Sequence, residues 1–357
     1  MTDGRPTRVG FIGTGAMARS HLRGLVERQD TQVVALCEPA DHALARAIEI
    51  FDQHGLAAPP NEPDWRRFVA QFADQLDAVF IITPHVFHFE QAVACLEAGV
   101  DVLLEKPMVM TAEEATALIE TRDRTGRLVV VAFQGSLSPQ VREAARLLRS
   151  GELGRILNIS AVVWQNWATA TVGTWRQQPE IAGGGFMFDT GAHMLNTVAD
   201  LGGEDVVEVA AWLEDDGYPV DIRATVMGRL ATGALITMNA CGSAIPSCHS
   251  DIRVFTEKAI LRTGIWGETL EIQRSGGRGL RKVRSVAPVP VWEQFLNVRA
   301  GRIDNPSPPE VGLRMARLWD AIRESASAGG AVVRPAAHAI APLAVGSLAA
   351  DLAAPAV

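Results

Sequence analysis

The sequence is poor in several residue types, and each shortage excludes a class of protein. The four cysteines among 357 residues form no Cys-x-x-Cys pair and have no histidines at zinc spacing, which argues against a disulfide scaffold or a clustered zinc site. No run of about 20 residues is apolar enough to span a membrane. The net charge of -8 and the single local basic cluster at 276–284 argue against a nucleic-acid partner.

Two further expectations follow from these shortages. The cysteines are predicted to be reduced thiols of a cytoplasmic protein, and the N-terminal apolar run leads into a glycine-rich turn rather than a secretory signal. The Ala-rich tail from Pro335 is interrupted by proline, histidine and aspartate, and is predicted to be a packed or loose tail.

Lysine is also scarce, since only three of the 33 Lys and Arg residues are lysines. One of them, Lys106, stands between Glu105 and Pro107 at the end of an apolar run. Arginine is the usual choice for a static ion pair, whereas lysine is a compact charge whose protonation the surroundings can change. This pattern favours a lysine that polarises a hydroxyl, although a surface cation paired with a neighbour is the ordinary alternative.

The length predicts two domains, with the first ending near residue 133. Short apolar runs there alternate with helical patterns, which predicts an α/β fold with a doubly wound parallel sheet. The expected strands are 8–13, 32–37, 77–83, 101–105 and 127–133, and the expected helices are 16–28, 39–54, 86–98 and 111–125.

The remainder, 134–357, is predicted to be an α/β domain with a large, mostly antiparallel sheet. An amphipathic helix is expected within 138–154, a strand within 155–164, and an irregular stretch rich in Trp, Thr and Gln after it. A glycine loop, a helix and a glycine stop follow at 183–203, then a strand meander over 205–274 and a late helix from Pro309. The basic cluster at 276–284 is predicted to be a solvated loop or hairpin.

A glycine motif follows the first strand. Gly13, Gly15 and Ala18 match Gly-x-Gly-x-x-Gly/Ala, in which the glycines permit a tight turn and the approach of a pyrophosphate, and the alanine permits close packing. Glu38 ends the second strand, where its carboxylate would accept hydrogen bonds from a ribose and repel a 2'-phosphate. The motif therefore predicts a dinucleotide site and favours NAD over NADP, and a glycine turn in an unrelated strand-helix unit is the alternative.

Other polar residues follow the later strands, at the edge where such sheets bind ligands. Thr83 and Pro84 close one strand, and Glu105-Lys106-Pro107 closes the next. His88 lies at the start of a helix on this edge, where it could be a helix-start or packing residue.

The third chemical motif lies in the second domain. Asp189 and His193 are four residues apart in a predicted helix and would share one face, where the carboxylate can orient an imidazole that carries a proton. A purely structural pair is an equal alternative, and the spacing offers no third ligand for a metal. Three tryptophans and an arginine precede this motif and could either line the binding site of a sugar-like ligand or be core residues: Trp164, Trp167, Trp175 and Arg176.

Together these stretches resemble the Gfo/Idh/MocA family of glucose-fructose oxidoreductases and inositol dehydrogenases over almost the whole chain. The resemblance implies an N-terminal Rossmann domain and a C-terminal domain whose sheet commonly mediates dimers or tetramers. Its catalytic group corresponds to Lys106, Asp189 and His193, placed in an interdomain cleft. His193 would take the proton of a substrate hydroxyl, Lys106 would hold the oxygen, and Asp189 would set the protonation of its neighbours.

Two sets of binding residues are expected on this basis. The expected cofactor-binding residues are Gly13, Gly15, Ala16, Met17, Glu38, Thr83, Pro84, His88, Glu105 and Lys106. The expected substrate-binding residues are Lys106, Gln134, Trp175, Arg176, Asp189 and His193, with no metal.

The chain departs from the family pattern at two places. Asn196 stands where many members have an aspartate three residues after the histidine. Gly135 and Ser136 follow the "VAF" strand where many have an arginine. Both changes concern substrate contacts, so the resemblance does not define one substrate.

The expected function is hydride transfer between NAD and a secondary alcohol or ketone of a sugar, polyol or inositol-like compound. The short-chain dehydrogenase pattern Tyr-x-x-x-Lys is excluded, because the only tyrosine, Tyr218, has no lysine four residues later. A glycosidase that uses transient oxidation and a non-catalytic NAD-binding regulator are the alternatives, since a fold alone does not prove activity.

Overall fold

The computed structural model describes residues 5–284 and 287–335, and these divide into two compact units. The first unit holds the described residues up to Ala132 together with Val291–Pro309. The second holds Phe133–Pro290 and the described residues from Glu310 onward. The first boundary lies within one residue of the expected one. The expectation that 134–357 is one continuous domain needs correction, because the segment Val291–Pro309 returns to the first unit.

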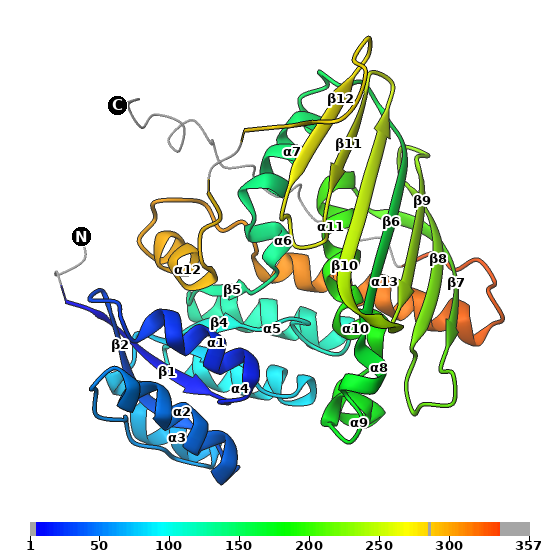
Figure 1. The fold of residues 1–357 in the computed structure, drawn as a ribbon. Helices are drawn as coiled ribbons and strands as arrows, with labels where there is room; N and C mark the ends of the chain where they lie inside the picture. The colour runs from blue at the N-terminus through cyan, green and yellow to red at the C-terminus, as the bar shows by residue number, and fades with distance from the viewer. Residues whose placement is uncertain (1–4, 285–286, 336–357) are drawn as a thin grey trace, which may run out of the picture. The chain divides into compact units, whose positions relative to one another are not determined.

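The first unit contains a parallel sheet in the order β2-β1-β3-β4-β5 (Figure 1). Its strands are β1 (Thr7–Ile12), β2 (Thr31–Cys37), β3 (Ala78–Ile81), β4 (Asp101–Leu104) and β5 (Val129–Val131). Its helices up to Ala132 are α1 (Ala16–Leu25), α2 (Asp41–Gln53), α3 (Trp65–Phe72), α4 (His88–Glu97) and α5 (Ala112–Thr125), with single 3-10 turns at η1 (Ala73–Gln75) and η2 (His85–Phe87). All five predicted strands and four predicted helices are confirmed, and α3 was not predicted.

Burial explains why these runs form central strands. Phe11, Phe80 and Leu103 are fully buried, as expected for strands covered on both faces. A side-chain cap precedes α5, since Thr111 Oγ1 accepts a hydrogen bond from the Glu114 amide at 3.2 Å. Gly126 ends that helix in the left-handed region, which glycine adopts without steric cost.

Helix α12 (Val291–Arg299) completes the first unit, although it lies about 160 residues after β5 along the chain. Trp292 Nε1 donates to Thr31 Oγ1 at 2.8 Å, and Arg299 Nε donates to Asp101 Oδ2 at 2.9 Å. These partners are the first residues of β2 and β4, so the contacts join residues far apart in the sequence and no local pattern indicates them.

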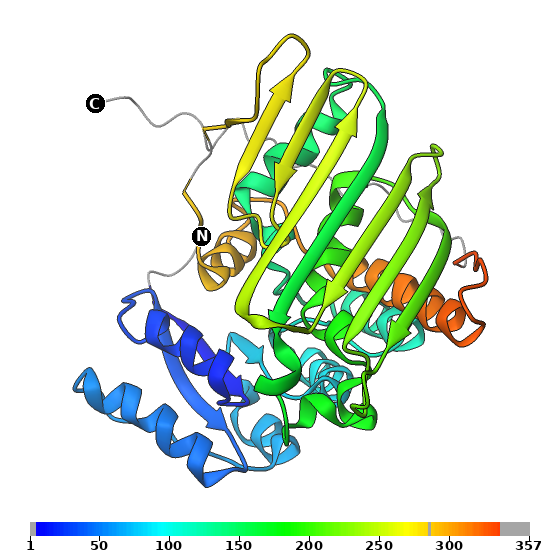
Figure 2. The same cartoon turned by 45° about the vertical axis from the view of Figure 1, so that its right-hand side comes forward.

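The second unit is built on a sheet in the order β13-β12-β11-β10-β6-β9-β8-β7 (Figure 2). Its strands are β6 (Ile156–Asn166), β7 (Val206–Glu214), β8 (Arg223–Leu230), β9 (Leu235–Cys241), β10 (Ser243–Thr256), β11 (Ala259–Thr263), β12 (Leu270–Arg274) and β13 (Arg281–Lys282). Every neighbouring pair is antiparallel except β6 and β9, which are parallel. The predicted meander is confirmed, and the basic cluster forms the β12–β13 hairpin.

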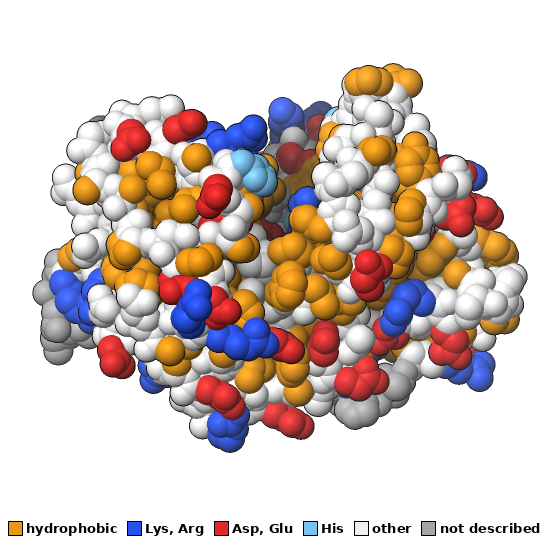
Figure 3. All heavy atoms as spheres, turned by 90° about the horizontal axis from the view of Figure 1, so that it is seen from below, with side chains coloured by type: hydrophobic (Ala, Val, Ile, Leu, Met, Phe, Trp, Pro, Cys, Tyr) orange, Lys and Arg blue, Asp and Glu red, His pale blue; other side chains and the backbone are white. Residues whose placement is uncertain are grey.

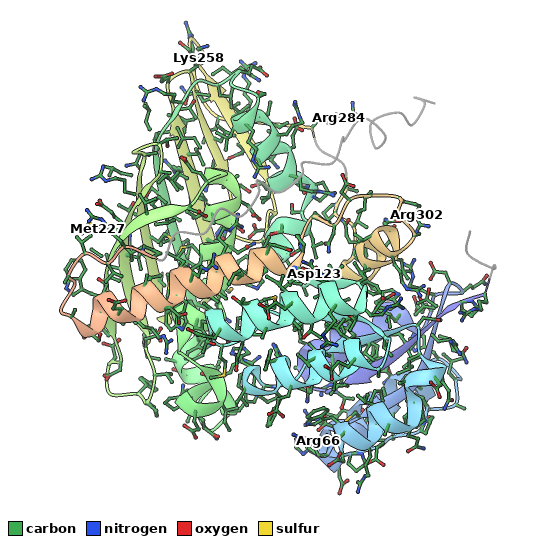
Figure 4. All side chains as sticks on the ribbon, turned by 180° about the vertical axis from the view of Figure 1, so that it is seen from behind. Arg66, Asp123, Met227, Lys258, Arg284 and Arg302 are labelled. Atoms are coloured by element: carbon green, nitrogen blue, oxygen red, sulfur yellow. The ribbon has the colours of Figure 1, made fainter. Side chains whose placement is uncertain are left out.

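Helices cover one face of this sheet and leave the other open (Figures 1 and 2). The longer ones are α7 (Pro139–Arg149), α11 (Gly191–Gly202) and α13 (Pro309–Ser327). Short turns connect them at α6 (Gln134–Leu137), α8 (Trp167–Ala170), η3 (Trp175–Gln177), α9 (Pro179–Ala182) and α10 (Phe186–Asp189). Strand pairing places Trp212, Met227 and Leu235 on the open face, where each is between 43% and 47% exposed (Figure 4 labels Met227).

None of the helices in the described part of the chain combines the length and the apolar character that a bilayer crossing requires. On the face drawn in Figure 3, acidic and basic side chains alternate rather than gather. Most of the Ala-rich tail, from residue 336, lies outside the described residues.

Candidate functional site

The first group of candidate residues lies in the glycine turn between β1 and α1. Gly13 has φ +92°, and a Cβ there would lie 2.4 Å from the Ile82 carbonyl oxygen, so only glycine fits. Gly15 is the residue before α1, it has no side-chain cap, and a Cβ there would meet no atom within 4 Å. Ala18 is fully buried. The start of α1 therefore presents backbone amides to open space, as a pyrophosphate requires.

Glu38 is oriented toward this turn by backbone amides. Its Oε2 accepts from the Thr14 amide at 2.8 Å and from Thr14 Oγ1 at 3.1 Å, and its Oε1 accepts from the Ala40 amide at 2.9 Å. Each carboxylate oxygen can accept further hydrogen bonds. The carboxylate is therefore held in place and keeps acceptor capacity for ribose hydroxyls. Ala16 and Met17, also expected to bind the cofactor, are exposed at the start of α1. The turn and this carboxylate together fit a dinucleotide.

Thr83 and Pro84 follow the end of β3, and both are half-buried. The buried side chain of His88 contacts the backbone of this loop. His88 is fully buried, with Nδ1 2.8 Å from the Pro107 carbonyl oxygen and Nε2 2.9 Å from the Thr83 carbonyl oxygen. Burial lowers the pKa of His88, although the two carbonyls and Glu105 act in the opposite direction. Full burial and the two carbonyl contacts favour the packing role that the sequence also allowed for His88, and binding of the cofactor by this residue stays a prediction.

Lys106 is half-buried at the end of β4, and contacts on both sides position its backbone. Glu105 Oε2 accepts from the Lys106 amide at 3.1 Å, and Glu105 Oε1 lies 3.3 Å from His21 Nε2. The His21 ring in turn packs on Phe80, with ring centroids 4.6 Å apart. On the other side His88 contacts the carbonyl of Pro107. Two histidines thus position the residues before and after Lys106.

His21 is a functional candidate that the sequence reasoning missed. It is the last residue of the "GFIGTGAMARSH" motif and lies in α1, so the signal was present in the motif itself. Its partner Glu105 is 84 residues away along the chain. Only the packing of α1 beside β4 reveals that pair.

The second unit carries the acid and the histidine. Asp189 is buried, and its Oδ2 accepts from Trp167 Nε1 at 2.9 Å and from Arg176 Nε at 3.0 Å. It ends α10, whereas His193 lies in α11, so the single helix expected for the pair is two consecutive helices. Arg176 also lies over the Trp175 ring, 4.4 Å from its centroid. Arg176 therefore forms a direct ion pair with the Asp189 carboxylate, which the spacing of these residues in the sequence did not indicate.

The glycines before Asp189 are required by close packing. A Cβ on Gly185 would lie 2.0 Å from the Asp221 carbonyl oxygen, and a Cβ on Gly184 would lie 2.6 Å from both Phe188 and Trp319. The Asp221 carboxylate accepts hydrogen bonds from the amides of Gly185 at 2.6 Å and Met187 at 2.9 Å. Burial raises the pKa of Asp221. This buried acid organises the loop that leads into Asp189.

His193 is 8% exposed and lies between two aromatic rings. Phe133 meets it edge-on with ring centroids 6.3 Å apart, and the Trp266 centroid is 6.0 Å away. Gln134, another expected substrate contact, is exposed at the start of α6. Trp266 was not foreseen as a site residue, because it lies 73 positions after His193 in the printed sequence.

The two departures from the family pattern contact each other. Asn196 Nδ2 donates to Ser136 Oγ at 2.7 Å, and Ser136 Oγ donates to Asp200 Oδ2 at 2.5 Å. Arg314 donates to both Asn196 and Asp200. All four side chains belong to one buried network that joins α6, α11 and α13. These two positions therefore stabilise the packing of the helices in this chain.

The comparisons with known proteins identify the family. Residues 7–133 match the oxidoreductase family profile described as an NAD-binding Rossmann fold, and residues 141–262 match the GFO/IDH/MocA C-terminal domain. The chain belongs to the Gfo/Idh/MocA family of oxidoreductases. The expected family, fold class and NAD-binding domain are thus confirmed.

Several members of the Gfo/Idh/MocA family are similar to this chain. A D-glucoside 3-dehydrogenase of Escherichia coli is 29% identical over 54% of this chain and 52% of its own. An inositol 2-dehydrogenase of Rhodococcus erythropolis is 32% identical over 44% of each chain. The chain thus spans about half the length of the curated relatives it matches.

Solved structures match over a longer range. A levoglucosan dehydrogenase in complex with NADH and levoglucosan has a TM-score of 0.79 at 24% identity, over 93% of this chain and 100% of its own. An oxidoreductase domain protein from Kribbella flavida has a TM-score of 0.81 at 22% identity, over 93% and 100% of the two chains. At this identity the likeness shows the fold.

Proposed function

We propose that this protein is an NAD-dependent dehydrogenase acting on a secondary alcohol or ketone of a sugar, polyol or inositol-like compound. One observation supports this most: a buried Asp189, held by Trp167 and Arg176, precedes the nearly buried His193 by four residues. Such a pair is suited to proton transfer. The dehydrogenases for D-glucoside, inositol and levoglucosan among its relatives have names that fit this class.

In the proposed mechanism, each residue has a separate role. Bound NAD would supply the hydride acceptor for alcohol oxidation and the hydride donor for the reverse reaction. His193 takes the hydroxyl proton, and the Lys106 ammonium holds the same oxygen. Asp189 provides the negative charge that favours a protonated neighbour, and Arg176 limits that effect. The residues that would hold NAD are Gly13, Gly15 and Glu38, with Thr83 and Glu105 at the neighbouring strand ends.

The proposed preference for NAD over NADP depends on Glu38. Its carboxylate is fixed by the amides of Thr14 and Ala40, so it would have to move or change protonation to admit a 2'-phosphate. Like charges at close range disfavour each other strongly when partly buried.

We further propose that the protein forms a homodimer or homotetramer through the open face of its eight-stranded sheet. Trp212, Met227 and Leu235 share that face and are all more than 40% exposed, so the face offers apolar side chains that a second copy of the chain could cover. Sedimentation of the protein at several concentrations tests this, and a purely monomeric species would contradict it. A cytoplasmic location stays a prediction from the cysteine content.

The deciding test of the proposed activity is NADH formation with a panel of sugars, polyols and inositols. Lys106→Ala should still bind NAD while turnover falls by at least ~100-fold, the scale expected for an acid-base or polarising group. Lys258→Ala is the matched control, because that lysine lies at the exposed tip of the β10–β11 hairpin (Figure 4). Near-normal turnover of the Lys106 variant would contradict the role of Lys106.

A second candidate is a glycosidase that uses transient oxidation. It is favoured by the 30% identity to a glycosyl hydrolase family 109 protein of Stenotrophomonas maltophilia, over 44% of this chain and 36% of that protein. Such an enzyme would cleave a glycoside without accumulating NADH. Loss of a chromogenic glycoside with constant NADH would therefore replace the first proposal. Binding of NAD without any turnover, equal in wild type and Lys106→Ala, would instead favour a regulatory protein.

A further inference from the structure

Trp266 is the half-exposed aromatic ring beside His193. Its centroid lies 6.0 Å from that of the imidazole, whereas the other neighbouring ring, Phe133, is fully buried. Of these two rings, only Trp266 has surface to offer a bound molecule. A substrate whose hydroxyl meets His193 would therefore pass close to this indole.

The turn that carries Trp266 is attached firmly on both sides. The Ile265 carbonyl accepts from Thr197 Oγ1 at 2.7 Å, and the Ile265 amide donates to Ser250 Oγ at 3.0 Å. After the tryptophan, the Gly267 carbonyl accepts from Ser138 Oγ at 2.9 Å. Thr197 lies one helical turn after His193 in α11, so one helix positions both the imidazole and the indole.

Gly135 makes this arrangement possible. A Cβ at this position would lie 2.1 Å from Thr197 Oγ1 and 3.0 Å from the Ile265 carbonyl oxygen. Any larger residue at 135 would displace the turn that carries Trp266. The position where many members of the family have an arginine is therefore closed to a side chain, and the surface next to His193 is aromatic instead of cationic.

We propose that Trp266 is a substrate-binding residue that selects neutral ring substrates. The flat indole packs against the apolar C–H face of a pyranose or cyclitol, an arrangement that buries apolar area without a charged partner. Acidic sugars gain nothing from this surface, because no cation stands at position 135. The proposal rests on the dehydrogenase function proposed above and adds a determinant of its specificity.

The test compares Trp266→Ala and Trp266→Phe with the wild type on methyl glucoside, myo-inositol, glucitol and glucuronate. We expect Trp266→Ala to raise KM for the two neutral ring compounds by about 10-fold or more with a smaller change in kcat, because uniform binding is lost. Trp266→Phe should retain most of the affinity, since it keeps an aromatic face. Trp65→Ala, in the other unit, is the matched control and should behave as wild type.

Binding is also measured without turnover, by saturation-transfer NMR of each compound with protein and NAD. The expected result is transfer to the ring C–H protons of the neutral cyclic compounds, lost in Trp266→Ala and weak for glucuronate from the start. Unchanged transfer in Trp266→Ala, equal transfer to glucuronate, or no transfer to any ring compound with the wild type would each overturn the proposal. Transfer that depends on Trp266 without NADH formation would instead contradict the dehydrogenase activity alone, so the two failures are distinguishable.

Discussion

The two ring nitrogens of His88 contact different carbonyls, so substitutions can test the role of each contact separately. An asparagine amide places a donor near the Nδ1 position, and a glutamine amide places one near Nε2. His88→Asn should therefore retain the contact to the Pro107 carbonyl, 2.8 Å away, and lose the one to Thr83. His88→Gln should retain the contact to the Thr83 carbonyl, 2.9 Å away, and lose the one to Pro107.

The effect on stability follows from burial. His88 is fully buried, and a neutral imidazole carries one ring proton, so the variant that loses the donating nitrogen leaves one buried carbonyl without its donor, at a cost of about 1–3 kcal/mol. A loss of about 2 kcal/mol corresponds to a decrease in melting temperature of about 4–8 °C for a unit of this size. That variant should show this decrease and the other a smaller one, and circular dichroism measures both.

The effect on turnover should differ between the variants. Pro107 directly follows Lys106, so loss of the Pro107 contact frees the lysine, and a misplacement of about 1 Å can cost about 100-fold in rate. We expect His88→Gln to have a kcat about 10- to 100-fold below wild type and below that of His88→Asn, with NAD affinity unchanged in both. Calorimetric titration of NAD and steady-state kinetics give these values. Equal kcat in the two variants would refute the positioning role.

The same histidine predicts how stability depends on pH. Burial lowers the pKa of His88 below its ordinary value, so the unfolded chain binds the proton first as the pH falls. The unfolding free energy should be insensitive to this group above about pH 6.5 and should decrease as the pH falls from there toward the folded-state pKa. Both variants lack the imidazole, so their stability should decrease less steeply below about pH 6.5, by up to about 1.4 kcal/mol per pH unit. Identical slopes in denaturant titrations would contradict this.

Two further predictions concern the second unit and the cofactor. Arg176→Met removes a charged donor to the Asp189 carboxylate and should lower kcat/KM by about 10-fold, with partial recovery in Arg176→Lys. Kinetics on the same substrate checks both variants, and a wild-type value for the methionine variant would exclude the role. Glu38→Gln keeps the shape of the side chain but removes its charge, so the ratio of kcat/KM for NAD to that for NADP should fall by about 10-fold or more. An unchanged ratio would show that Glu38 does not select the cofactor.

The parallel sheet of the first unit could be predicted because its signals are local. Each strand is a short apolar run that ends at a turn residue, and burial on both faces requires that composition. The glycine motif is also a local signal, because the backbone of Gly13 has a positive φ that other residues adopt only at a cost in free energy. Lys106 stood out for a similar reason, because lysine is rare in this chain and this one ends a strand.

Contacts between distant residues could not be predicted in this way. His21 contacts Glu105, which lies 84 residues later in the sequence. Helix α12 belongs to the first unit although it follows the strands of the second unit along the chain. One sequence contains no signal for which of many polar side chains will become neighbours, because chain folding and packing select the pairs.

The substrate side of the site shows this difference most clearly. The sequence showed that Gly135 and Asn196 depart from the family pattern, but it offered no reason for either change. In the folded chain Asn196 belongs to a buried network with Ser136, and Gly135 leaves room for the turn that brings Trp266 beside His193. Residue types and motifs define the reaction that the chain can perform, whereas steric packing around α11 defines the surface that its substrate meets.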